Sequence, residues 1–150
     1  MIEIATIEVN LDKTHLFKHV EIPFSVENEY HRLVVSYQYF PKRYEGDDAY
    51  ELAYNAFKEA YGESEVRMED VLNELPLNNH VTLSIAREGN LLGTAHRHSP
   101  NMEIELSKTP TVGFHSIDST KGEYKLILSV HALLTECVNA SIKVTAYERV

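Results

Sequence analysis

The chain has 150 residues, with 14 basic and 23 acidic side chains, a formal net charge of −9 and one cysteine. This length is typical of one domain, and the acidic excess opposes binding to the phosphate backbone of nucleic acids. A single cysteine, Cys137, excludes an intramolecular disulfide, and no apolar run approaches the roughly 18 residues of a membrane span. We therefore expect one cytoplasmic domain over residues 1–150 that binds neither nucleic acid nor a membrane.

The first part of the chain predicts strands. Apolar and polar side chains alternate in 2–9, 20–26 and 33–39, which places one set toward a core and the other toward solvent. Pro23 lies in the second of these segments. That strand is therefore expected at a sheet edge or at a bulge, because proline cannot donate a ladder hydrogen bond.

Residues 47–75 break the alternation and predict a helical insertion. Asp47 or Asp48 can cap a helix that Gly62 ends. Apolar side chains at helical spacing form one stripe, which consists of Tyr50, Ala53, Tyr54, Phe57, Ala60 and Tyr61. A second, shorter helix is expected over 67–75.

The rest of the chain returns to strands. The predicted segments are 81–85, 102–106, 111–115, 124–132 and 138–146. In the last two, every even-numbered residue is apolar, Tyr124 included, so Leu128 and Ile142 are expected in the core. The short link between them predicts an antiparallel hairpin within one sheet.

Seven or eight short strands with one helical interruption indicate a fold class. They favour an all-β, two-sheet antiparallel β-sandwich of jelly-roll or immunoglobulin-like type, with a helical insertion at about 47–75. The sequence has no internal repeat and no linker rich in Pro, Gly or Ser. Nothing in it therefore argues for a second domain.

Several short elements of this sandwich resemble one known family. They are a Gly-small-small-His-Arg-His element at 93–98, a Thr-Pro and Gly-aromatic element at 109–114, and a Gly-x-aromatic strand start at 122–124. Together with the opening strands they resemble the N-terminal β-sandwich accessory domain of bacterial PHP-type metallohydrolases. The likeness covers about residues 20–147, apart from 44–76. Tyr124 stands where that family usually has tryptophan, and still supplies a large ring for the inter-sheet core.

The resemblance implies a fold and an accessory role. No catalytic domain is expected, because the residues after His98 are already assigned to strands. The resemblance therefore implies a free-standing, non-catalytic accessory or interaction domain, which acts through a protein partner or through copies of itself. It carries over no hydrolase activity.

A histidine cluster offers an alternative. His96 and His98 share one face of a strand, where neutral imidazoles can bind zinc or another divalent metal, with His131 as a third ligand. His115 or His80 could take that third place. Such a centre would make the chain a metal-binding protein or a small metal-dependent hydrolase. Two ligands are not a site, however, and a structural or surface role for these histidines is the preferred interpretation.

Other catalytic patterns do not occur. The sequence has no Gly-x-Ser-x-Gly elbow and no Gly-rich phosphate loop, and Cys137 has no basic neighbour that would activate its thiol. We therefore expect no enzyme activity and no cofactor.

The predicted helix supplies a candidate binding surface instead. A helix inserted into a sandwich is not needed to complete the sheets, so its apolar stripe requires another surface to pack against. The candidate partner-binding residues on this stripe are Tyr50, Tyr54, Phe57 and Tyr61. Recognition of a carbohydrate or another small ligand on aromatic rings or on a sheet face is a further alternative.

Overall fold

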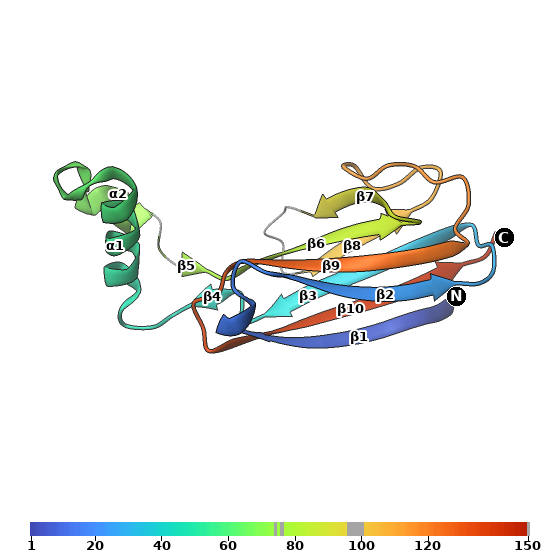
Figure 1. Ribbon diagram of the computed structural model, residues 1–150, viewed down its shortest axis with the longest axis horizontal. Coiled ribbons are helices and arrows are strands. Elements are labelled where there is room, and N and C mark those ends of the chain that lie inside the picture. The colour runs from blue at the N-terminus through green and yellow to red at the C-terminus, as the bar shows by residue number, and fades with distance from the viewer. Residues whose placement is uncertain (74, 76, 96–100, 150) are drawn as a thin grey trace.

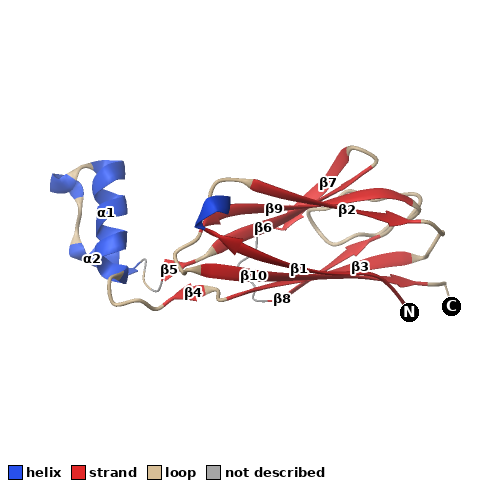
Figure 2. Cartoon of the chain, turned by 60° about the horizontal axis from the view of Figure 1, so that its bottom comes forward, coloured by secondary structure: helices blue, strands red, loops and turns tan. Residues whose placement is uncertain are grey.

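The computed structural model describes residues 1–73, 75, 77–95 and 101–149. Within them, two four-stranded antiparallel sheets pack face to face, as the side view in Figure 2 shows. The first sheet has the order β1 (Ile2–Asp12), β10 (Cys137–Tyr147), β3 (Arg32–Phe40) and β8 (Asn101–Leu106). The second has the order β2 (His19–Val26), β9 (Gly122–Ala132), β6 (His80–Arg87) and β7 (Asn90–Ala95). The predicted all-β sandwich is confirmed.

Alternation along the strands forms the core. The even-numbered residues of β9 from Tyr124 to Val130, and those of β10 from Val138 to Ala146, are at most 3% exposed. Leu128 and Ile142 are buried as predicted, at 0% and 1% exposure. Tyr124 is buried as well and stacks on Phe24 of β2, with ring centroids 5.0 Å apart.

One predicted pairing is wrong. β9 and β10 do not form a hairpin, because β9 pairs with β2 and β6 in the second sheet, whereas β10 pairs with β1 and β3 in the first. The chain crosses between the sheets through residues 133–136, where Leu133 is 4% exposed. Both strands turn their even-numbered side chains toward the core, whether they lie in one sheet or in opposite sheets. The alternation in the sequence therefore cannot distinguish a hairpin within one sheet from a link that crosses between the two sheets.

The hairpin of the second sheet joins β6 to β7. Glu88 and Gly89 make its two-residue turn, and both have positive φ, 49° and 80°, as expected for the turns that match strand twist. The predicted strand at 111–115 is absent from the described structure, where Val112 and Gly113 form a turn and Phe114 makes one isolated bridge to Gly93.

The predicted helical insertion is confirmed. It comprises α1 (Ala49–Tyr61), the 3-10 turn η2 (Glu63–Glu65) and α2 (Met68–Asn73), which we call the helical head. Figure 1 shows the head beyond one end of the sheets, past the short strands β4 (Arg43–Tyr44) and β5 (Leu77–Asn78), which pair with each other. A further 3-10 turn, η1 (Lys13–His15), links β1 to β2.

Buried tyrosines predict that stability falls in alkali. Burial raises the pKa of Tyr124 to about 12, and its Oη donates a hydrogen bond of 2.7 Å to the Thr120 carbonyl. Burial also raises the pKa of Tyr37, whose Oη donates to the Val81 carbonyl at 2.8 Å. Folded pKa values above the unfolded value of about 10 mean that this stabilisation is complete below pH 10 and is lost as the pH rises toward 12. Urea denaturation from pH 8 to pH 11 should therefore show a shallower decline for Tyr124→Phe than for the wild type; parallel curves would contradict this expectation.

Candidate interaction surface on the helical head

Helix α1 carries far more apolar surface than one neighbouring helix can cover. At about 100° per residue, an apolar arc runs from Leu52 through Ala56 and Ala53 to Tyr61 and Tyr54, more than half of the circumference. The helix begins after Asp48 and ends at Gly62. The Asp48 carboxylate makes no capping bond and instead accepts a hydrogen bond from Tyr44 Oη, which raises the pKa of that phenol.

The partner helix α2 covers only part of this arc. It has six residues, and the buried residues of the head are Ala53 of α1 and Val71 of α2, at 4% and 0% exposure. Large apolar side chains of the head remain exposed, namely Leu52 at 37%, Leu72 at 52%, Tyr61 at 67% and Met68 at 68%. A group of exposed large apolar side chains on one small unit is typical of an interaction site.

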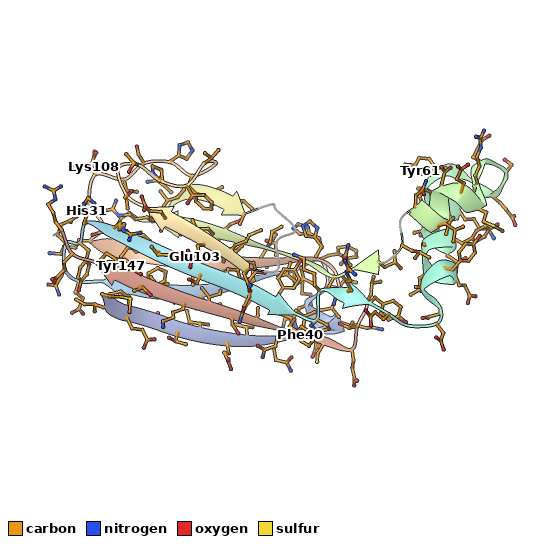
Figure 3. The ribbon with its side chains drawn as sticks, turned by 180° about the vertical axis from the view of Figure 1, so that it is seen from behind. His31, Phe40, Tyr61, Glu103, Lys108 and Tyr147 are labelled. Carbon is orange, nitrogen blue, oxygen red and sulfur yellow. The ribbon has the colours of Figure 1, made fainter. Side chains whose placement is uncertain are left out.

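Part of that surface is hollow. A shallow groove of about 210 Å³ is lined by Ala53, Ala56, Phe57, Tyr61 and Leu77. Of these residues, Phe57 and Tyr61 contact each other, with ring centroids 5.9 Å apart. Leu77 comes from β5, where the chain returns toward the sheets. Figure 3 shows Tyr61 on the head, well separated from Phe40 at the end of β3.

The structure brings together half of the predicted partner-binding residues. Phe57 and Tyr61 line the groove, whereas Tyr50 and Tyr54 lie on α1, half-buried, and are not part of the groove lining. The sequence prediction missed Leu77, which lies in a different element. It also missed the exposed Leu52, Met68 and Leu72.

A buried amide fixes the base of the head. Asn79 is 0% exposed, and its Nδ2 donates to the Pro41 carbonyl and to Thr135 Oγ1, both at 2.9 Å. Its Oδ1 accepts from the backbone N–H of Leu134 at 2.7 Å. One side chain therefore joins the segment that leaves for the head, the segment that returns from it and the crossing between β9 and β10.

The predicted metal site is placed only in part. His96 and His98 lie outside the described residues. His131 lies on the outer face of the second sheet, where its Nε2 is 2.9 Å from Thr82 Oγ1 and its ring centroid is 5.0 Å from that of His80. His115 is exposed on the loop after β8. Among the described residues, no group of three or more His, Cys, Asp or Glu side chains is arranged to hold a metal ion.

The outer face of the first sheet is a second concave surface. A hollow of about 460 Å³ crosses all four strands, with polar side chains such as Gln38, Glu103, Ser141 and Lys143 along it. Tyr37, the aromatic residue in its lining, is only 3% exposed. The aromatic platform expected for a sugar site is therefore not formed by the described residues of this face.

The fold and this surface define a β-sandwich with an inserted, incompletely covered helical head. No protein-family model matches the chain, and no curated protein matches it significantly. A solved crystal structure of a protein from Sulfurospirillum deleyianum aligns over 97% of this chain and 99% of its own, with 13% identity and a TM-score of 0.40. Within the described residues, no helix is long and apolar enough to cross a membrane.

Proposed function

We propose that the chain is a non-catalytic interaction domain whose helical head binds another protein. One observation carries this proposal: the head presents large apolar side chains, Tyr61, Met68 and Leu72 among them, that are more than half exposed. The sandwich has a complete core of its own and does not use them. Their proposed role is therefore contact with another protein.

The energetics of the head support the same conclusion. Ordering each residue costs about 1–2 kcal/mol of backbone entropy, and short helices are stabilised mainly by packing of an apolar face. In the head, that packing fully buries only Ala53 and Val71. A partner that covers the exposed side chains would supply the missing burial, at about 25 cal/mol per Å² of apolar surface.

The resemblance to the accessory sandwich of PHP-type metallohydrolases supports an accessory role. In that family the sandwich accompanies a separate catalytic domain, so its own contribution is contact rather than chemistry. The helical head has no counterpart in the resemblance, which leaves out residues 44–76. A binding role for the head is therefore proposed as a property of this chain in particular.

Affinity capture with a matched pair of variants tests the proposal. The double variant Tyr61→Ser, Leu72→Ser removes two exposed apolar groups of the head, and Val112→Ser removes one that is 91% exposed on a loop of the sandwich. From an extract of the native host, we expect wild type and Val112→Ser to retain the same protein. The double variant should retain it at least about fivefold less, because buried anchors carry most interface energy.

Two results would contradict the proposal. One is equal capture by the double variant and the wild type. The other is loss of capture in Val112→Ser alone, which would place the contact on the sandwich. We expect the sheets to remain folded in both variants, because each replaced side chain is more than half exposed, and amide spectra of each variant verify this.

A further inference from the structure

We infer that the groove of the head takes an amphipathic helix of another protein that carries Lys or Arg beside its apolar stripe. This inference rests on the proposed function and names the class of partner. It follows from the shape of the groove, from the state of its backbone and from the charge around it.

The shape fits a helix. Ala53 and Ala56 are small, so a partner helix can approach the axis of α1 closely, as in ridges-into-grooves packing. The rings of Phe57 and Tyr61 and the side chain of Leu77 complete the lining, so apolar side chains of a partner would meet apolar groups throughout the groove. An arriving helix would act as the third helix of a small bundle and cover the part of α1 that α2 leaves open.

The part of the groove that α1 forms offers no edge to a strand. The groove runs along α1, where the N–H and C=O groups of the interior are bonded within the helix, up to the Gly62 N–H that donates to the Lys58 carbonyl. Addition of a strand requires an unpaired sheet edge, whereas a helix in a groove is held by side-chain packing alone.

The charge around the groove selects a cation. Between residues 49 and 73 the head carries the cations Lys58 and Arg67 and six exposed carboxylates, which are Glu51, Glu59, Glu63, Glu65, Glu69 and Asp70. At about 100° per residue, Glu59 borders the apolar arc beside Leu52, whereas Lys58 borders it beyond Tyr54, with Glu51 about 20° farther round the helix. Lys58 is partly neutralised, because its Nζ lies 4.0 Å from Glu63 Oε2. Electrostatic complementarity therefore favours a basic partner.

The same charge argues against a second copy of this chain. In a twofold dimer the same surface meets itself, so two heads that each carry six carboxylates and only two cations would be brought together. Like charges directly opposed are repulsive, most strongly where the interface excludes water.

A pair of synthetic peptides tests the inference. Each is an amphipathic helix of about four turns with one leucine stripe; in the first the flanking residues are Lys, and in the second each Lys is replaced by Glu. Fluorescence anisotropy should show that the Lys peptide binds at least about fivefold more tightly than the Glu peptide. Raising NaCl from about 0.05 M to about 0.5 M should reduce this preference, because salt screens exposed charges.

Matched variants locate the binding. Ala56→Asp places a carboxylate in the groove, and Asn55→Asp adds the same charge on the polar side of the same helix; both residues are exposed, so the head remains folded. We expect Ala56→Asp to weaken binding of the Lys peptide at least about tenfold, and Asn55→Asp to leave it unchanged or slightly tighter. Amide shift changes should centre on the groove.

The outcomes separate the two claims. Equal binding of both peptides in the groove overturns the inference about charge and leaves the proposed function standing. Shift changes spread over the sandwich, or equal effects of Ala56→Asp and Asn55→Asp, overturn the assignment of the groove. Absence of peptide binding, combined with partner capture that does not depend on Tyr61 and Leu72, overturns the inference and the proposed function together.

Discussion

Substitution of Leu128 by alanine is expected to lower the free energy of unfolding by about 2–5 kcal/mol. Leu128 is 0% exposed on β9, with Val20 of β2 and Leu83 of β6 as its neighbours in register. Removing its side chain leaves a cavity that close-packed neighbours fill only in part. Ile142→Ala should cost a similar amount, because Ile142 occupies the corresponding inner position of β10 in the opposite sheet.

Outward-facing lysines on the same strands provide the control. Lys143 Nζ lies 3.7 Å from Glu3 Oε1, and Lys125 Nζ lies 3.2 Å from Glu21 Oε2, with all four side chains largely exposed. Exposed ion pairs contribute little, so Lys143→Ala and Lys125→Ala should each change stability by no more than about 0.5 kcal/mol. Urea denaturation of the four variants measures the difference, and a reversed order would be incompatible with the assigned inner faces.

Periodicity in the sequence predicts which side chains are buried better than it predicts which strands pair. The even-numbered residues of β9 and β10 were correctly predicted as inward, because a period of two is a property of one strand. The predicted hairpin was wrong, because a link of a few residues can close a hairpin or cross to the other sheet. Contacts distant in sequence decide between them, here the pairing of β9 with β2 and β6 and of β10 with β1 and β3.

Strand β7 illustrates a second limit. Its residues Leu91 and Leu92 are adjacent apolar residues, and Gly93 follows, so the segment shows no alternation and was missed. The turn before it was the better signal, because Gly89 accepts the positive φ that a two-residue hairpin turn needs.

The candidate surface was predictable to the extent that it lies on one helix. The stripe of α1 gives Phe57 and Tyr61 directly, since helical spacing alone places them together. Leu77 could not be found in this way, because it reaches the groove only after the chain has passed through α2 and returned in β5. The sequence also could not predict how much of the apolar arc of α1 is exposed, because this depends on how little of the arc α2 covers.

Asn79→Ala is expected to cost about 2–4 kcal/mol, far more than the loss of one surface amide, because it removes hydrogen bonds from three half-buried groups at once. The Leu134 N–H, the Pro41 carbonyl and Thr135 Oγ1 each lose a bond to the Asn79 side chain. The backbone bonds at this position survive, since the Asn79 N–H donates to the Lys42 carbonyl and its carbonyl accepts from Tyr39 Oη. The cost therefore reports on the side-chain amide itself.

Asn79→Asp should destabilise the protein at least as much. Aspartate is nearly the same size as asparagine but replaces the Nδ2 donor by an oxygen that faces the Pro41 carbonyl at about the same distance.

Asn139→Ala is the matched control, because Asn139 is exposed on β10 and accepts one long bond of 3.4 Å from Ser141 Oγ. The stability of this variant should stay within about 0.5 kcal/mol of wild type. Chemical denaturation and amide hydrogen exchange measure the two effects. Exchange should accelerate first in β4, in β5 and at Leu134, the segments that the amide joins at the base of the head. If Asn79→Ala and Asn139→Ala were equally mild, the buried amide would not be what holds these segments together.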